Sequence, residues 1–225
     1  MTATPDAERV TIAERVHALH EGMTGQLPEA ALQAFGAEQT GLDARGVPGG
    51  VAAAGSVVPD VPLLDVHGDQ TSLYAALAGA PAVIVLYRGA WCPYCNLALR
   101  AYQEDLVPVL AERGIGLLAI SPQKPDGSLS MQEKNELTFT VLSDPGNRIA
   151  GALGVLTAPT DEVRAVQGSL GLDLRETNAD GTTAVPMPTV LLTDATGRLR
   201  WLDVHPNYTT RTEVSDIITA LGTLA

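Results

Sequence analysis

Basic residues are scarce in this chain of 225 residues. Lys and Arg together number 14 against 26 Asp and Glu, which gives a formal net charge of −12, and lysine occurs only at Lys124 and Lys134. Proteins that bind nucleic acids or anionic membrane surfaces need an excess of positive charge, because they neutralise phosphate groups. The charge balance therefore argues against a nucleic-acid partner and against a membrane partner.

Long apolar runs are missing as well. No stretch approaches the roughly 18 unbroken apolar residues that a membrane-spanning helix needs. Residues 1–10 include Asp6, Glu8 and Arg9, where a secretory signal peptide would be apolar. Hydrophobic residues still make up 45% of the chain, which is enough for a globular core. We expect a cytoplasmic protein of one or two domains.

Composition divides the chain into three parts. Residues 1–45 carry apolar side chains at helical spacing, and we expect a first helix that begins at Pro5 after a Thr4 cap and a second helix over residues 28–38. This extension either packs on the main domain or acts as a dimerisation or substrate-covering arm. Residues 46–56 contain mainly small residues and proline and are expected to form a linker. Residues 57–225 form the expected main domain.

The main domain alternates strand-like and helix-like segments, which predicts an α/β fold. Residues 81–87 are continuously apolar and rich in β-branched side chains, as in a strand that is buried on both faces of a sheet. The following helix is expected to kink at Pro108, and a last helix is expected to begin at a Thr210–Glu213 capping box. Residues 157–185 have no clear assignment. Other strands are predicted at residues 61–66, 115–120, 139–142, 189–193 and 199–204, and a helix at 130–137.

The chain has only two cysteines, Cys92 and Cys95. They open a predicted helix, where the first-turn amides and the helix dipole stabilise a thiolate, and Pro93 suits the first helical turn. A separation of two residues brings the sulfurs within bonding reach, so one thiol can attack a target and the other can resolve the mixed disulfide. We predict a redox-active dithiol with no bound cofactor, in which the more exposed Cys92 attacks and Cys95 resolves.

Other uses of the pair stay open. A zinc site needs two further ligands, and the remaining candidates, His17, His20, His67 and His205, are not paired at ligand spacing within the α/β part. A static disulfide would close a very short loop and would be unusual in the cytoplasm. A redox sensor without turnover, or a dimer that shares a metal between two dithiols, is the remaining alternative.

The residues around the pair resemble the thioredoxin fold, a central mixed β-sheet flanked by helices. The motif follows a buried strand, and Pro188 and Thr189 lead into a later strand. In this fold the proline before that strand is cis and faces the dithiol, so the resemblance implies a cis bond between Met187 and Pro188. The motif residues are Trp91, Cys92, Pro93, Tyr94 and Cys95.

Further segments are similar to the peroxiredoxin branch of this fold, the alkyl hydroperoxide reductase/thiol-specific antioxidant proteins. The resemblance covers about residues 57–221, and it is closest to the peroxiredoxin-like subgroup that carries Cys-Pro-x-Cys. The segments are Ile120-Ser121-Pro122-Gln123, Val141-Leu142-Ser143-Asp144-Pro145 and Gly154-Val155.

The chain departs from the peroxiredoxin signature Pro-x-x-x-Thr-x-x-Cys. When the signature is aligned on Cys95, the Pro position is Arg88 and the Thr position is Cys92. When it is aligned on Cys92, these positions are Val85 and Gly89, so neither register supplies the threonine. The arginine that usually lies just before the later strand is also absent, because residues 185–188, Val-Pro-Met-Pro, occupy that place.

The resemblance implies roles for the neighbours of the dithiol. Arg88 either supplies a guanidinium near the thiolate or is a solvated or ion-paired residue at a strand end. Trp91 either shields the thiolate and docks partners or packs as core. Pro93 and Tyr94 would tune the reduction potential. Pro188, followed by Thr189, either faces the dithiol or only opens the later strand.

The leading hypothesis is a thiol oxidoreductase that reduces protein disulfides or hydroperoxides. Its reductant would be a thioredoxin-type protein or a low-molecular-weight thiol, and a homodimer is what the resemblance suggests. The alternative is a true thiol peroxidase, in which Cys95 or Cys92 is oxidised to a sulfenic acid and its neighbour condenses on it.

Overall fold

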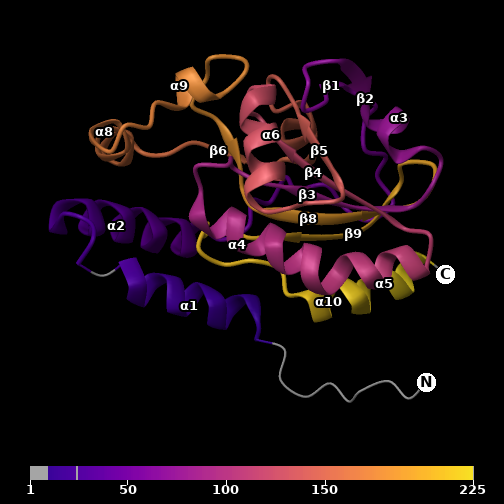
Figure 1. The fold of residues 1–225 in the computed structure, drawn as a ribbon, viewed down its shortest axis with the longest axis horizontal. Coiled ribbons are helices and arrows are strands. Elements are labelled where there is room, and N and C mark those ends of the chain that lie inside the picture. The colour runs from indigo at the N-terminus through magenta and orange to yellow at the C-terminus, as the bar shows by residue number, and fades with distance from the viewer. Residues whose placement is uncertain (1–9, 24, 225) are drawn as a thin grey trace.

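The computed structural model describes residues 10–23 and 25–224, which build a mixed sheet with helices on both faces (Figure 1). The sheet strands are β1 (Pro62–Leu64), β2 (Gln70–Ser72), β3 (Ala82–Leu86), β4 (Gly116–Ser121), β5 (Thr140–Ser143), β8 (Thr189–Thr193) and β9 (Leu199–Val204). Their order is β2-β1-β5-β4-β3-β8-β9, with β3, β4 and β5 parallel and β8 antiparallel to β3 and β9. The predicted α/β fold with a mixed sheet is confirmed, as is the hairpin β8–β9.

Helices surround the sheet, and a short ladder of β6 (Leu156–Thr157) and β7 (Val185–Pro186) lies beside it. The helices are α1 (Ile12–Met23), α2 (Glu29–Arg45), α3 (Leu73–Leu77), α4 (Pro93–Ala101), α5 (Val107–Glu112), α6 (Pro125–Lys134), α7 (Arg148–Leu153), α8 (Asp161–Ser169), α9 (Leu174–Thr177) and α10 (Val214–Ala220). A π-helical turn, Tyr102–Leu106, joins α4 to α5, and a 3₁₀ turn, Leu221–Leu224, follows α10.

Strand β3 explains the continuous apolar run, because all five of its residues are buried. Val83 and Val85 belong to the core beneath α4, α5 and α10, whereas Ala82, Ile84 and Leu86 belong to the core beneath α3 and α7. Side chains of a strand alternate between the two faces, so a strand covered on both sides is apolar throughout. This strand carries the dithiol loop at its carboxyl end.

Pro108 disturbs the long helix after the dithiol as expected. A proline in a helix lacks an amide hydrogen, and its ring crowds the carbonyl four residues earlier, here that of Glu104. The chain accommodates this by widening to a π-helical turn over Tyr102–Leu106 before α5 begins at Val107. Tyr102 and Leu106 of this turn are fully buried, so the widened turn is part of the core.

Helix α1 has a capping box at its described start. The described part of α1 starts at Ile12, and Thr11 and Glu14 form the capping box: the amide of Glu14 donates to Thr11 Oγ1 at 3.1 Å, and the amide of Thr11 donates to Glu14 Oε2 at 2.8 Å. The predicted cap at Thr4 and Pro5 lies outside the described residues.

Glu213 also has a different role from the one predicted. Its carboxylate does not form a capping box with Thr210 but accepts the amides of Ile12 and Ala13, at 2.9 and 2.8 Å. These are free amides at the positive end of α1, which a carboxylate stabilises. The contact joins residues 200 positions apart and therefore has no signal in local spacing.

The second helix and the linker also differ from the expectation. Helix α2 continues through the predicted stop near Gly41 to Arg45, and Gly46, whose φ of 63° suits a helix end, follows it. Residues 46–56 contain no helix or strand but are packed rather than loose: Ala52 donates to the carbonyl of Leu153 at 3.0 Å. The division of the chain at residues 45 and 56 stays a prediction.

The remaining differences concern loops and one peptide bond. The unassigned residues 157–185 contain α8 and α9, and the helix expected at 130–137 begins earlier, at Pro125. No described peptide bond is cis, so the predicted cis bond before Pro188 is wrong.

None of the described helices is long and apolar enough to span a membrane. The cytoplasmic location stays a prediction.

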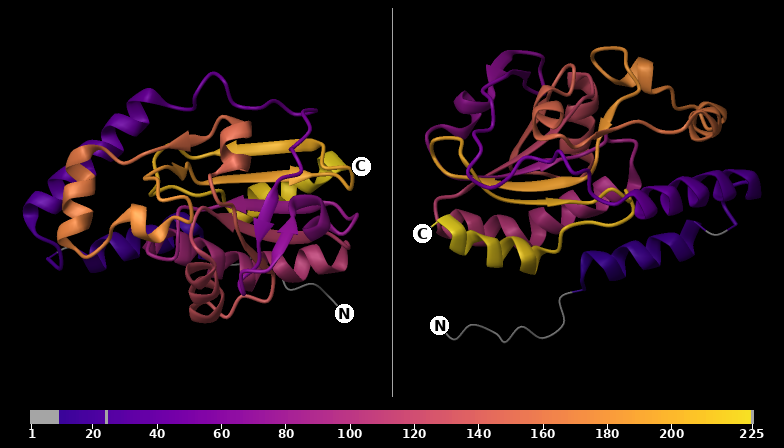
Figure 2. Two further views of the ribbon diagram at one scale, coloured as in Figure 1. Left: turned by 90° about the horizontal axis from the view of Figure 1, so that it is seen from above. Right: turned by 180° about the vertical axis from the view of Figure 1, so that it is seen from behind.

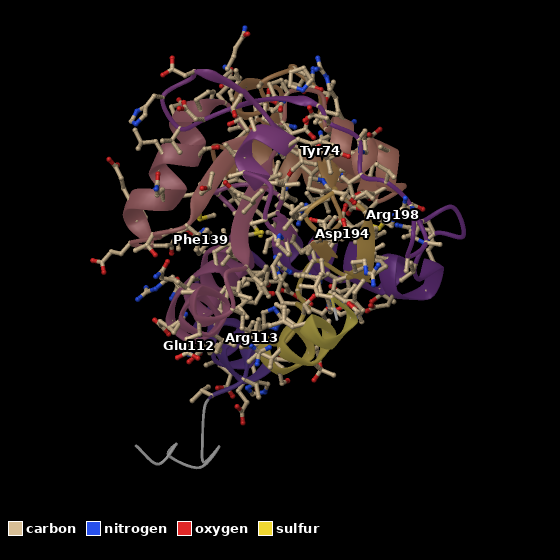
Figure 3. The ribbon with its side chains drawn as sticks, turned by 90° about the vertical axis from the view of Figure 1, so that its right-hand side faces the viewer. Tyr74, Glu112, Arg113, Phe139, Asp194 and Arg198 are labelled. Carbon is tan, nitrogen blue, oxygen red and sulfur yellow. The ribbon has the colours of Figure 1, made fainter. Side chains whose placement is uncertain are left out.

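Replacing Glu213 with alanine is expected to weaken the docking of α1. Loss of a carboxylate that caps a helix costs about 1 kcal/mol, so the free energy of unfolding in urea should fall by that amount, and amide exchange should quicken at the start of α1. Glu112→Ala is the matched control, since Glu112 lies exposed at the end of α5 (Figure 3) and makes no contact with the start of α1 that corresponds to that of Glu213. If both variants lost the same free energy of unfolding, the role of Glu213 as the cap of α1 would be contradicted.

Candidate active site

The dithiol loop is held by side chains from two neighbouring elements. Gln123, just after β4, accepts the amide of Ala90 at 2.9 Å, and Asn96 of α4 donates to the carbonyls of Ala90 and Cys92, both at 2.8 Å. Gly89 has no room for a side chain, because the Trp91 indole and Gln123 Oε1 occupy that space. The chain therefore turns tightly from β3 into α4, with Cys92 as the residue that precedes the helix.

Both thiols are free and buried, and each cysteine is only 1% exposed. The expectation that Cys92 is the more exposed residue is therefore wrong. The guanidinium of Arg211 contacts both sulfurs: Nη2 lies 3.1 Å from Cys95 Sγ and 3.7 Å from Cys92 Sγ. The shorter contact favours negative charge on Cys95.

The surroundings of the pair separate the two pKa values. Burial by itself raises the pKa of the Cys95 thiol, but the hydrogen bond from the Cys92 thiol, the charge of Arg211 and the backbone amide of Arg88 together lower it well below its usual value. Burial and the neighbouring Cys95 raise the pKa of the Cys92 thiol. The surroundings thus favour the thiolate form of Cys95, with the Cys92 thiol as the donor of a hydrogen bond to it.

Arg211 lies on the loop between β9 and α10, and a polar network holds this loop. Asp203 Oδ2 accepts from His205 Nε2 at 2.9 Å and from the hydroxyl of Thr212 at 2.8 Å, while the buried Tyr102 hydroxyl donates to the Thr212 carbonyl at 2.8 Å. Arg211 itself donates to the Thr210 carbonyl at 2.6 Å. The residue that contacts both sulfurs is therefore anchored on both sides.

Arg88 is neither solvated nor ion-paired. It is 4% exposed, and its guanidinium carbon lies 4.0 Å from the ring centre of Tyr208 and 5.1 Å from that of Trp91. Within the described part of the chain, its side chain has no hydrogen bond and no carboxylate partner. Stacked aromatic rings hold the cation while leaving its N–H groups free.

A groove of about 590 Å³ opens over this side of the dithiol. Cys92 lines it together with Arg88, Trp91, Pro93 and Tyr94, whereas Cys95 does not. Trp91 is half-buried and packs on Arg88, and the hydroxyl of Tyr94 lies 2.6 Å from Nε2 of His20 on α1. The helical extension thus reaches the dithiol motif directly.

Pro188 and Thr189 lie on the other side of the pair. They line a small cavity of about 10 Å³ with Cys95 and Arg211, which is room for about one water molecule. Thr189 does not donate to a sulfur, because its hydroxyl is bonded to the Met187 carbonyl at 2.8 Å. Pro188 therefore lies beside the dithiol, as expected, although the bond before it is trans.

Metal ligands do not gather around the pair. In residues 10–23 and 25–224 no group of three or more His, Cys, Asp or Glu side chains is arranged to hold a metal ion. Among the candidate histidines, His17 Nδ1 lies 3.8 Å from Glu21 Oε1, and His205 Nε2 forms a hydrogen bond with Asp203 Oδ2.

Comparison with known families assigns the chain to one of them. The model of the AhpC/TSA family matches residues 54–202. This chain belongs to the AhpC/TSA family. The predicted peroxiredoxin resemblance is therefore confirmed. The match ends before Tyr208 and Arg211 and begins after α1 and α2, so these parts of the site lie outside the residues that the family model matches.

Similar proteins include named peroxiredoxins. Peroxiredoxin Bcp of Escherichia coli (strain K12) is 29% identical over 102 residues, which span 45% of this chain and 64% of the relative. The match with that relative thus covers slightly less than two thirds of its length. A putative peroxiredoxin of Mycobacterium tuberculosis (strain H37Rv) is 28% identical over 149 residues, 65% of this chain and 91% of the relative.

Solved structures share the fold of this AhpC/TSA chain. The peroxidoxin BcpB of Mycobacterium tuberculosis superposes with a TM-score of 0.56 at 20% identity, over 76% of this chain and 95% of the other. Reduced Prx3 of Vibrio vulnificus, in complex with hydrogen peroxide, superposes with a TM-score of 0.61 at 18% identity, over 76% and 99% of the two chains. The predicted thioredoxin-like fold is confirmed.

Replacing Arg211 with methionine is expected to raise the pKa of the Cys95 thiol, because the nearest cation and one hydrogen bond to the sulfur are lost. The measurement is the pH dependence of the ultraviolet absorbance of the thiolate, in a Cys92→Ser background where one thiol remains. The titration should move to higher pH.

Arg113→Met provides the control, since Arg113 lies exposed beyond the end of α5 (Figure 3). The assignment of Arg211 as the cation that stabilises the Cys95 thiolate would be contradicted by either of two results. Arg211→Met would leave the pH midpoint of the thiolate absorbance unchanged, or Arg113→Met would shift it by the same amount.

Proposed function

We propose that this protein is a thiol-dependent hydroperoxide reductase in which Cys95 is oxidised and Cys92 resolves the product. The observation that carries the proposal is the environment of Cys95 Sγ, which faces the Arg211 guanidinium at 3.1 Å and accepts hydrogen bonds from the Cys92 thiol and the Arg88 amide. The thiolate is the reactive form of cysteine. The peroxiredoxin relatives also support the peroxidase alternative better than a general disulfide reductase.

In the first step the Cys95 thiolate attacks the terminal oxygen of a hydroperoxide, ROOH. An S–O bond forms, the O–O bond breaks, and the departing RO⁻ takes a proton from solvent to become the alcohol ROH. The sulfur is oxidised to a sulfenic acid, and the peroxide is reduced by the same two electrons. We assign the stabilisation of negative charge on the leaving oxygen to the free N–H groups of Arg88, which lines the groove beside the pair.

In the second step the Cys92 thiol attacks the Cys95 sulfenic acid. The Cys92–Cys95 disulfide forms, and the hydroxyl leaves as water with the thiol proton. Cys92 precedes α4 without a side-chain hydrogen bond that caps the helix. Both cysteines are buried, so the start of α4 has to shift to admit the peroxide and to close the disulfide.

In the third step an external thiol restores the dithiol. It attacks Cys92 Sγ, because Cys92 is the cysteine that lines the groove. Cys95 then leaves as the thiolate that Arg211 stabilises, and a thiol of low pKa is the better leaving group. A second external thiol then attacks the mixed disulfide at Cys92, which releases the oxidised reductant and restores the Cys92 thiol. A thioredoxin-type protein and a low-molecular-weight thiol both supply this chemistry, and the suggested homodimer stays a prediction.

Cysteine variants test the assignment. Wild-type protein should consume one equivalent of cumene hydroperoxide per dithiol and lose both thiols as a disulfide. Cys92→Ser should react and gain one oxygen in mass, since its sulfenic acid has no resolving thiol. Cys95→Ser should react no faster than a free thiol.

The reverse pattern, with a sulfenic acid in Cys95→Ser and an inert Cys92→Ser, would assign the attack to Cys92. Wild-type protein that reduces an oxidised dithiol protein but consumes peroxide no faster than a free thiol would overturn the peroxidase proposal.

A further inference from the structure

We infer that Asn96, with Asn135 behind it, is a positioning residue that sets the reduction potential of the Cys92–Cys95 pair by holding the dithiol loop in its reduced form. The inference rests on the step of the proposed function in which the pair closes to a disulfide. It goes beyond that step, because neither asparagine supplies an electron or a proton to it.

Asn96, the residue after Cys95, holds the loop through both hydrogens of its side-chain amide. Its Nδ2 donates to the carbonyl of Ala90 and to that of Cys92, each at 2.8 Å. The Cys92 carbonyl also accepts the backbone amides of Cys95 and Asn96, each at 3.1 Å. Asn96 thus joins the loop before Trp91 to the residue that precedes α4, and a movement of Cys92 disturbs these bonds.

Asn135, which follows α6, fixes the direction of the Asn96 amide. Helix α6 ends beside α4 (Figures 1 and 2), and Asn135 Nδ2 donates to Asn96 Oδ1 at 2.8 Å and to the Met131 carbonyl at 3.0 Å. The Met131 carbonyl can only accept, so Asn135 presents its Nδ2 to both partners. Asn96 then has to turn its own Nδ2 toward the two loop carbonyls.

These bonds favour the dithiol over the disulfide. The two sulfurs belong to free thiols that share a hydrogen bond, and they have to draw together before they can bond to each other. The start of α4 shifts in that step, and the Cys92 carbonyl, to which Asn96 donates, moves with it. The amide of Asn96 therefore stabilises the reduced form more than the oxidised form, which raises the reduction potential of the pair.

Reduction potentials of two variants test the inference. The proteins are equilibrated in buffers of reduced and oxidised glutathione, and the fractions of dithiol and disulfide are read from masses after alkylation. In Asn96→Leu the equilibrium constant for reduction should fall about tenfold, a potential about 30 mV more negative, because the lost hydrogen bonds belong mainly to the reduced form. Asn135→Leu should fall about threefold, since Asn96 keeps its own donors.

Gln103→Leu is the matched control. Gln103 also joins the helix after the dithiol to the segment after α6: its Oε1 accepts the Thr138 amide at 2.8 Å, and its Nε2 donates to the Thr138 hydroxyl at 3.0 Å. Neither of these bonds reaches the dithiol loop. This variant should lose stability in both redox forms alike and keep the wild-type reduction potential.

The outcomes separate this inference from the proposed function. Wild-type potentials in both Asn96→Leu and Asn135→Leu would overturn the inference and leave the peroxidase proposal standing. A shift in Gln103→Leu as large as that in Asn96→Leu would also overturn it, because general weakening of the fold would then explain both. If Asn96→Leu does not fold, Asn135→Leu decides alone.

Two further results concern the wild-type protein. If its thiols form no disulfide in oxidised glutathione, both the inference and the second step of the proposed function are overturned. If it forms the disulfide and the variants shift as expected, the inference stands even where peroxide is not consumed, because glutathione is the redox partner in this experiment.

Discussion

The contact between Arg211 and Cys95 is the interaction on which the rest of the site depends. A buried thiolate without a partner would be costly, and its pKa would rise until the thiol stayed neutral. One guanidinium nitrogen at 3.1 Å, a thiol donor and a backbone amide offset that cost. The same contact makes the two cysteines unequal, since Cys92 lies farther from the charge.

Residues 205–213 connect this contact to the rest of the fold. Within this one loop, Tyr208 stacks under Arg88, Arg211 reaches the sulfurs, and Glu213 caps α1. Helix α1 in turn brings His20 to Tyr94, between the two cysteines. The helical extension and the dithiol are therefore positioned by the same segment, and a change in its conformation would reach both.

The pair of arginines accounts for the departure from the peroxiredoxin signature. In the alignment on Cys95, Cys92 stands where the signature has threonine, and its thiol donates to the Cys95 sulfur. This chain lacks the arginine that usually precedes the later strand, here β8. Arg211, which follows β9, supplies a guanidinium instead. Arg88, at the position of the signature proline, supplies a second cation on the side of the groove. A hydrogen-bond donor and a cation are thus present at the thiolate, although different residues supply them.

The amino-acid sequence by itself determined the features that depend on neighbours along the chain. The buried strand β3, the dithiol at the start of a helix and the disturbance at Pro108 follow from apolar pattern, spacing and the chemistry of proline. Only the tertiary structure decided which cysteine lies nearer to a guanidinium, because Arg211 lies 116 residues from Cys95 and no local pattern marks it. The role of Glu213 was decided in the same way. Electrostatic and packing contacts act through space, and the folded chain alone sets those distances.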